Sequence, residues 1–235
     1  MDLNGARHLP SAPAKREFVR SMFDRIAPRY DLMNRLMTLG MDQRWRRAAL
    51  DAAALKPGDR VVDLGTGTGD LVELARRRGA RAIGVDLAPG MLRAAHQRHP
   101  EALLVRADGA CFPFSDQTFD AVTCGFALRN FTDPDQIFAE CARILTTGGQ
   151  LILLEVDEPR SRLLRWGHAL YFHHIIPLLG TLLSDGKAYR YLPASAAYLP
   201  GEEELRAQLE KAGFTHIRKR RHLFGAAQEI AATRA

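Results

Sequence analysis

Short apolar runs alternate with amphipathic stretches between residues 60 and 155. The runs are rich in Val, Ile and Leu, which is typical of strands buried on both faces of a parallel sheet. In the stretches between them, apolar residues recur at helical spacing. Strand and helix in alternation predict an α/β fold with a mostly parallel sheet. The expected strands are Arg60–Leu64, Arg81–Asp86, Leu103–Arg106, Phe119–Cys124 and Gln150–Glu155, and the expected helices are Asp70–Arg78, Pro89–Gln97 and Asp133–Leu145.

The segments on either side of this alternation complete one expected domain over residues 1–235. Residues 1–12 are polar and contain proline, and we expect them to be disordered. After Pro159 the alternation stops, and residues 160–200 form an insert rich in aromatic residues and Leu, which we expect to be a helical lid. The other expected elements are helices Lys15–Ile26, Asp42–Leu55 and Glu202–Ala212, and an antiparallel C-terminal pair of strands, Thr215–Arg221 and Ala227–Thr233, which makes the sheet seven-stranded.

The composition fits a globular protein with a sizeable core, since 46% of the 235 residues are hydrophobic and 26% are charged. Residues 1–20 carry charges instead of the apolar run of a signal peptide. The three cysteines have neither metal-like nor redox-like spacing, so we expect a reduced, cytoplasmic setting. The apolar segment Leu163–Leu183 is interrupted by an arginine, histidines and a proline, which favours short amphipathic helices over a membrane span.

The formal net charge is +6. A basic balance suits nucleic acid, an anionic bilayer or an acidic substrate, and it is equally compatible with an arginine-rich solvated surface. Basic residues cluster around Trp45 and again at 218–221, without a nucleic-acid motif or a ladder of stacking aromatic residues. We therefore expect no nucleic-acid partner, while the cluster of Arg44, Arg46 and Arg47 leaves a peripheral membrane contact open.

A glycine loop stands between the first expected strand and the helix that follows it. The strand runs directly into Gly65–Gly69, and Asp86 ends the next strand. A glycine-rich turn with an acid about twenty residues further on is the signature of an adenosine-cofactor site. A dinucleotide fingerprint requires a small residue where this chain has Asp70, whose charge would oppose a pyrophosphate. A cationic sulfonium ligand has no such conflict, so the loop favours S-adenosylmethionine (SAM) over NAD.

Two other groups fall at expected strand ends, where open α/β sheets bind ligands. Asp108 and Gly109 follow the third strand, where an acid and free backbone N–H groups could bind an adenine ring. Arg129 follows the fourth strand, beside the cofactor. Arg129 either pairs with Asp133 or Asp135, or it lowers the pKa of a substrate hydroxyl or orders a water that acts as base.

Aromatic and polar residues elsewhere could surround a substrate. Tyr30 and Asn34 precede the first strand and either pack locally or line a pocket. Tyr189 and Tyr191 in the insert either pack against the core or form a wall for an aromatic ring. The adjacent pair His173-His174 points apart on a helix, with no carboxylate or cysteine at ligand spacing, so we expect no metal.

Several motifs together carry a resemblance to a known family. They are Tyr30-Asp31-x-Met33-Asn34 with Trp45, Gly125-Phe126-Ala127-Leu128-Arg129-Asn130, Gly148-Gly149 leading to Leu154-Glu155, and Tyr191-Leu192-Pro193 with Pro200. Through them the chain resembles the class I SAM-dependent methyltransferases, and among these the UbiE/MenG-type C-methyltransferases of ubiquinone and menaquinone biosynthesis, over roughly residues 18–215. The chain departs from the family pattern at Thr38, Asp42, Thr146-Thr147, Val156-Asp157 and Gly225–Gln228. These departures lie mostly on the substrate side, so another small aromatic or lipophilic acceptor is the alternative.

The resemblance implies a Rossmann-like methyltransferase fold, SAM as cofactor, and cofactor contacts at Thr68, Asp86 and Asp108-Gly109. It implies methylation of a ring carbon of a demethylated prenyl quinol, without a metal or a covalent enzyme intermediate. Arg129 and Tyr30 are the expected catalytic residues, and a homodimer is left open. The full expected cofactor set is Asp63, Gly65, Thr66, Gly67, Thr68, Gly69, Asp86, Leu87, Met91, Asp108, Gly109 and Gly125, and the expected substrate-binding set is Asn34, Asn130, His174, Tyr189 and Tyr191.

Overall fold

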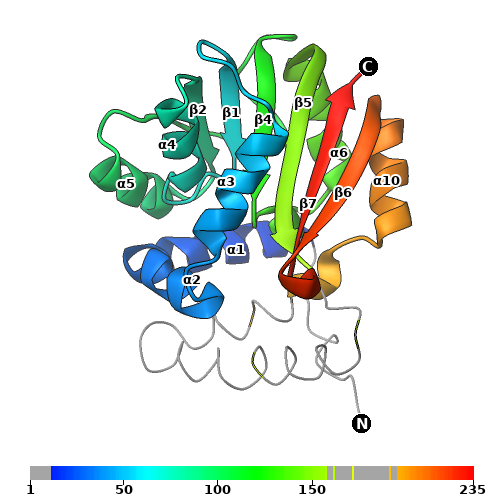
Figure 1. Cartoon of the computed structure of the whole chain (residues 1–235). Coiled ribbons are helices and arrows are strands. Elements are labelled where there is room, and N and C mark those ends of the chain that lie inside the picture. The colour runs from blue at the N-terminus through cyan, green and yellow to red at the C-terminus, as the bar shows by residue number, and fades with distance from the viewer. Residues whose placement is uncertain (1–11, 158–160, 162–170, 172–190, 192–194) are drawn as a thin grey trace.

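The computed structural model describes residues 12–157, 161, 171, 191 and 195–235. Its centre is a seven-stranded sheet with the order β3-β2-β1-β4-β5-β7-β6 (Figure 1). The strands β1 to β5 are parallel, and β7 is inserted antiparallel between β5 and β6. This arrangement confirms the predicted sheet with its antiparallel C-terminal pair. The strands are β1 Arg60–Leu64, β2 Arg81–Asp86, β3 Leu103–Arg106, β4 Phe119–Gly125, β5 Leu145–Val156, β6 Phe214–His222 and β7 Ala227–Arg234.

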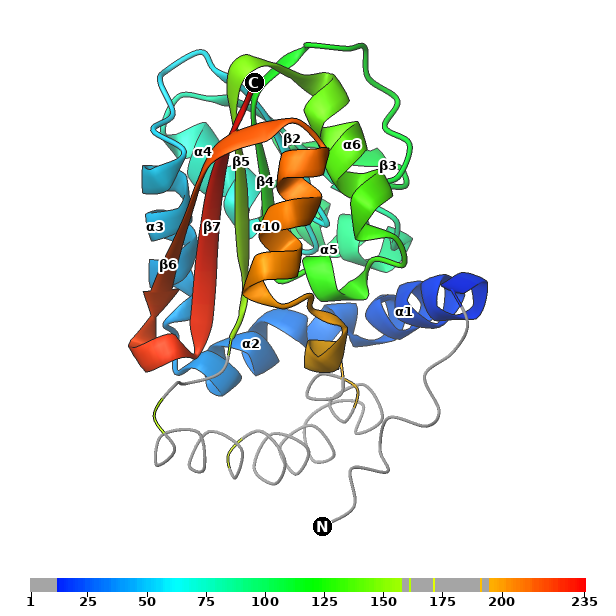
Figure 2. The same ribbon diagram turned by 90° about the vertical axis from the view of Figure 1, so that its right-hand side faces the viewer.

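Helices cover both faces of this sheet. α3 and α4 lie on one face, and α6 and α10 lie on the other, as Figure 2 shows most clearly. The helices are α1 Ala12–Ile26, α2 Tyr30–Thr38, α3 Asp42–Ala52, α4 Asp70–Arg77, α5 Pro89–Arg98, α6 Pro134–Ile144 and α10 Glu202–Lys211. Short 3-10 turns are η2 Ala27–Arg29, η3 Leu128–Asn130, η5 Ala196–Tyr198 and η6 Leu223–Gly225. The expected disordered segment 1–12 and the expected lid fall almost entirely outside the described residues.

Several element boundaries differ from the prediction by a few residues, and two of these differences have identifiable reasons. α3 ends at Ala52, before the predicted Leu55, because Ala54 has left-handed backbone with φ of 48°. β5 begins at Leu145, before the predicted Gln150, because Leu145 already pairs with Phe119 across a register shift in the ladder. Apolar runs indicate which residues are buried, but backbone pairing beyond the apolar run leaves no hydrophobic signal.

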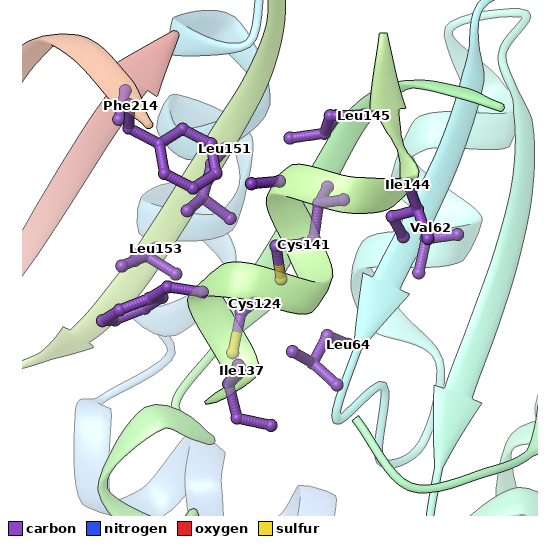
Figure 3. Packing of buried hydrophobic residues seen from close by; sticks show 14 of the residues in the cluster. Val62, Leu64, Cys124, Ile137, Cys141, Ile144, Leu145, Leu151, Leu153 and Phe214 are labelled. Atoms are coloured by element: carbon purple, nitrogen blue, oxygen red, sulfur yellow. The ribbon is translucent and has the colours of Figure 1, made fainter. Parts of the chain in front are cut away.

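The largest core lies between α6 and the sheet (Figure 3). Leu64, Cys124 and Leu153 project from three strands toward Cys141 and Ile144 of α6. Burial raises the pKa of Cys141 to about 12, so this side chain is a protonated thiol that packs as a small hydrophobic group.

α1 and α2 cross the carboxyl ends of the parallel strands (Figure 2). Asp24 of α1 accepts a hydrogen bond from the Gly90 backbone N–H at 2.6 Å, at the start of α5. A Cβ on residue 90 would lie 2.8 Å from the same carboxylate oxygen, so glycine permits this close contact. α1 is thereby fixed over the end of the sheet where α/β proteins bind their ligands.

Candidate active site

A cavity of about 1020 Å³, counting the part open to solvent, lies at the carboxyl ends of the parallel strands. Its size is that of a small-molecule site. Many of the predicted site residues line it, namely Tyr30, Gly65, Gly67, Asp86, Leu87, Met91, Asp108, Gly109, Gly125 and Asn130. Other predicted residues are absent from the lining, namely Asn34, Asp63, Thr66, Thr68, Gly69, Arg129 and Tyr191. His173, His174 and Tyr189 lie outside the described residues.

The three glycines of the loop have left-handed backbone, each with a different neighbour. A Cβ on Gly65 would lie 2.5 Å from the Ala127 Cβ, so this glycine allows the loop to pack against the protein. A Cβ on Gly69 would meet His99 at 3.2 Å, at the contact between α4 and α5. A Cβ on Gly67 would have only the Tyr30 ring nearby, in ordinary contact at 3.9 Å. Room for close approach of a ligand is therefore found at Gly67, whereas the other two glycines serve chain packing.

Asp86 holds the glycine loop from the end of β2. Its carboxylate accepts hydrogen bonds from the backbone N–H groups of Gly67 and Ala88, both at 2.8 Å. Burial raises the pKa of Asp86, and these backbone donors oppose the shift. Each carboxylate oxygen can accept a second hydrogen bond, so the residue can still receive the hydroxyls of a ribose in the cavity that it lines.

Asp108 and Gly109 form the part of the wall after β3. Asp108 accepts a hydrogen bond from the Ala110 backbone N–H at 3.0 Å and forms an ion pair with Arg16 of α1. A Cβ on Gly109 would lie 2.5 Å from Leu64 Cδ1, so glycine lets this backbone lie directly on the core. Asp108 and Gly109 both line the cavity, and a carboxylate beside peptide groups suits a planar ring with hydrogen-bonding edges, such as the predicted adenine.

α1 contributes a wall that the sequence pattern did not identify as part of the site. Arg16, Val19, Arg20 and Phe23 line the cavity. The apolar periodicity of α1 predicted only core packing, because cavity-lining and core residues share one helix face. Lys15 anchors the start of the helix: its ammonium group donates to the carbonyl oxygens of Phe131 at 2.8 Å and of Arg129 at 3.2 Å.

Asp70 is absent from the cavity lining and is ion-paired with two arginines. Its carboxylate lies 2.9 Å from Arg98 and 3.6 Å from Arg46, and it accepts a hydrogen bond from Gln43 at 2.8 Å. Burial by itself would raise the pKa of Asp70, but Arg46 and Arg98 lower it below its ordinary value. The same two arginines also pair with Asp42 and Asp31, so two guanidinium groups are shared among three carboxylates. The predicted repulsion between Asp70 and a pyrophosphate stays a prediction.

Thr68 is committed to a contact within the protein. Its hydroxyl donates to Asp31 of α2 at 2.6 Å, and Arg98 of α5 holds the other oxygen of Asp31 at 2.8 Å. The predicted cofactor contact of Thr68 is thus not available to its hydroxyl as a free donor. Asp31 links the helix that carries Tyr30 to the glycine loop, a role for which the sequence offered no signal beyond its place in a motif.

Arg129 is also absent from the cavity lining. Its guanidinium forms a buried ion pair with Glu155 at the end of β5, donates to the Phe126 carbonyl at 2.8 Å, and donates to the Ser195 hydroxyl at 3.1 Å. The two pairings considered from sequence are both absent, because Asp133 caps α6 and Asp135 pairs with Lys211. The guanidinium shapes the wall through Phe126 and does not face the cavity.

Tyr30 and Asn130 are the polar side chains of the predicted substrate region that do line the cavity. Burial raises the pKa of Tyr30, although a hydrogen bond with Asn34 and the charge of Arg46 oppose the shift. Tyr30 is therefore a neutral phenol near pH 7, which can donate a hydrogen bond. The Asn130 side-chain oxygen accepts a hydrogen bond from the Tyr191 hydroxyl at 3.3 Å, so Tyr191 supports the site from behind.

Asp63 supports the loop from within β1. Its carboxylate accepts a hydrogen bond from the Thr123 hydroxyl at 2.7 Å, and burial raises its pKa to about 6. Asp63 thus joins the two central strands immediately below the glycine loop, without lining the cavity.

Across the residues described, no three His, Cys, Asp or Glu side chains gather as metal ligands would. Within the same set of residues, none of the helices is long and apolar enough to span a membrane.

The strand order and the cavity at the glycine loop define a class I SAM-dependent methyltransferase. A SAM-dependent methyltransferase from Thermotoga maritima has the same fold, with a TM-score of 0.62 and 21% identity over 92% of this chain and 99% of that one. The model of the ubiE/COQ5 methyltransferase family matches residues 11–234. The chain therefore belongs to the ubiE/COQ5 methyltransferase family.

Two relatives illustrate how far the similarity extends. The demethylmenaquinone methyltransferase of Roseiflexus castenholzii is 45% identical over 93% of this chain and 94% of its own length. The ubiquinone/menaquinone biosynthesis C-methyltransferase UbiE of Geobacter sulfurreducens is 40% identical over 91% of this chain and 87% of its own length. The resemblance inferred from the motifs is confirmed, and with it SAM as the cofactor.

Proposed function

We propose that this enzyme transfers a methyl group from SAM to a ring carbon of a demethylated prenyl quinol. The observation that carries the proposal is the cavity itself: Asp86 and Gly67 form one wall, and Tyr30 and Asn130 face the same space. The relatives named for demethylmenaquinone and ubiquinone methylation support the choice of acceptor. SAM supplies an electrophilic methyl group, and the acceptor carbon becomes nucleophilic when a ring hydroxyl loses its proton.

The residues around the cavity divide into two groups under this proposal. Asp86 accepts the ribose hydroxyls, Asp108 and Gly109 bind the adenine edge, and Leu87 and Met91 form the apolar wall. Tyr30 donates a hydrogen bond that orients the quinol ring, and Asn130 contacts a ring substituent. Holding the two reactants in one geometry provides much of the acceleration in such a transfer.

We assign Arg129 a positioning role. Its ion pair with Glu155 and its hydrogen bond to the Phe126 carbonyl hold the wall that follows β4. The neighbouring Asn130 is kept at the cavity by this arrangement, and Tyr191 supports it on the other side. Loss of Arg129 would then affect turnover through the placement of Asn130.

A labelled-methyl assay on a panel of quinols tests the acceptor. We expect label from methyl-labelled SAM to enter demethylmenaquinol or a demethylated ubiquinol precursor, and calorimetry to show SAM binding without NAD binding. Binding of SAM with no label in any quinol, but transfer to another aromatic or lipophilic compound, would establish the alternative acceptor. The Tyr30→Phe variant serves as the site control, with an expected fall in turnover and nearly unchanged SAM affinity.

The prenyl acceptor is a membrane lipid, and we propose that the enzyme is cytoplasmic and contacts the bilayer peripherally. Of the arginine cluster predicted for this contact, two members are exposed and can reach a bilayer. Arg44 and Arg47 are exposed, whereas Arg46 is buried against Asp42 and Asp70 at 3.7 and 3.6 Å.

A further inference from the structure

α2 carries two apolar faces, of which only one is buried. Met33 on the inner face is fully buried in the core beneath α1. On the outer face, Leu32 and Leu36 lie one helical turn apart and are 54% and 37% exposed. Leu39, which is 81% exposed, follows directly as the left-handed residue that ends the helix. A helix that needed only to pack on the core would carry polar residues on that outer face.

A second exposed apolar site lies in the turn η6 between β6 and β7. Leu223 and Phe224 are 44% and 78% exposed. Both have left-handed backbone, with φ of 44° and 55°, which is unusual for bulky residues. The turn and α2 lie at the same end of the molecule in Figures 1 and 2, the end at which the cavity is found.

On the α2 side of this surface the exposed charges have one sign, whereas on the η6 side Arg221 is paired with Asp157 and Glu202. Arg35 lies on the outer face of α2, and Arg44 follows at the start of α3; both are exposed. The two acids between residues 25 and 50, Asp31 and Asp42, are ion-paired with Arg98 and Arg46. No acid occurs in residues 214–228, which include η6. An apolar surface edged by cations complements an anionic membrane, where apolar side chains enter the acyl boundary and cations meet lipid phosphates.

We propose that these residues form a membrane-docking surface for anionic bilayers. The α2–η6 surface comprises Leu32, Arg35, Leu36, Leu39, Arg44, Leu223 and Phe224. The proposal rests on the proposed function in one respect: a prenyl quinol resides in the bilayer, and docking at this end brings the cavity to it. α2 also carries Tyr30, so the helix that docks is the helix that faces the ring.

Vesicle flotation tests the surface without any substrate. Vesicles of phosphatidylcholine with an equal part of phosphatidylglycerol should bind the wild type, and pure phosphatidylcholine should bind it much more weakly. The double variant Leu39→Glu, Phe224→Glu should lose roughly tenfold or more of its partitioning. Leu103→Glu is the matched control, since Leu103 is also exposed (63%) but begins β3 at the opposite end of the sheet. We expect this control to bind as the wild type does.

Equal partitioning of the double variant and the wild type would overturn the proposal, as would an equal loss in Leu103→Glu or no binding of the wild type to anionic vesicles. Circular dichroism and SAM calorimetry on each variant verify that the fold and the cofactor site are intact. Turnover of a short-tailed, water-soluble quinol should be unchanged in the double variant, whereas turnover of a long-tailed quinol in vesicles should fall. Absence of transfer to every quinol by the wild type would refute the proposed acceptor and leave the flotation result standing.

Discussion

Replacement of Arg129 by Ala separates a buried positioning role from a direct chemical one. Arg129 is 5% exposed and Glu155 is fully buried, so the variant leaves a carboxylate in the core without its cation. Breaking a buried pair from one side costs about 3–5 kcal/mol. The hydrogen bonds to Phe126 and Ser195 are lost as well, and hydrogen bonds of a charged group contribute about 1.5–3 kcal/mol each. We expect the free energy of unfolding to fall by about 3–5 kcal/mol in total, since these contributions overlap.

Urea unfolding at constant pH measures this loss, and a double-mutant cycle assigns it. Glu155→Gln alone leaves the buried Arg129 guanidinium without its carboxylate partner and should be destabilising to a similar degree. Arg129→Ala combined with Glu155→Gln should be much more stable than the sum of the single losses, with a coupling of roughly 2 kcal/mol or more. Arg143→Ala is the control, because Arg143 pairs with Asp116 and Glu140 at the surface, where such pairs contribute about 1 kcal/mol or less.

The kinetic result completes the test. A positioning role predicts that Arg129→Ala lowers turnover and stability together. Turnover should recover partly in Arg129→Ala with Glu155→Gln, because that variant has no unpaired buried charge. A variant that unfolds within about 1 kcal/mol of the wild type but has lost turnover would refute the positioning role. Arg129 would then act on the acceptor directly.

Other changes have equally definite expected outcomes. Asp86→Ala should weaken SAM binding at least tenfold, or about 1.4 kcal/mol, in calorimetry; an unchanged affinity would remove Asp86 from the ribose role. Gly65→Ala should cost about 1–3 kcal/mol in urea unfolding, because φ is 66° and the new Cβ meets Ala127, and Ala127→Gly should restore part of it. The neutral carboxyl of Asp63, whose pKa burial raises to about 6, stabilises the fold at low pH, and this contribution is lost as the pH rises from the ordinary value of 3.8 through 6. The difference in unfolding free energy between Asp63→Asn and the wild type should therefore change in favour of the variant by at most about 3 kcal/mol between about pH 4 and pH 8. Unfolding free energies that depend on pH in the same way in both proteins would contradict the buried ionisation.

The fold was predictable because its signals are local. Each parallel strand, such as Arg60–Leu64, is a short apolar run, and each helix has apolar residues at helical spacing. The alternation of strands and helices can therefore be recognised from the sequence without any knowledge of tertiary contacts. The glycine loop and Asp86 were equally readable, since the spacing between a strand and its turn is set within one supersecondary unit. The lining role of Val19 and Phe23 was not predictable, because the same helix face supplies Met22 and Ile26 to the core.

Polar residues in the motifs proved harder to assign, because a polar side chain in a sequence does not reveal its partner. Thr68 and Arg129 were both predicted to meet a ligand, yet the hydroxyl of Thr68 meets Asp31 from α2, and the guanidinium of Arg129 meets Glu155 from β5. These partners come from other elements and are brought near only by the complete fold. Tyr30 has no such commitment to an ion pair and lines the cavity. The case for direct contact with the acceptor is therefore stronger for Tyr30 than for Arg129, since a group already satisfied by a buried partner must break that contact before it can bind a substrate.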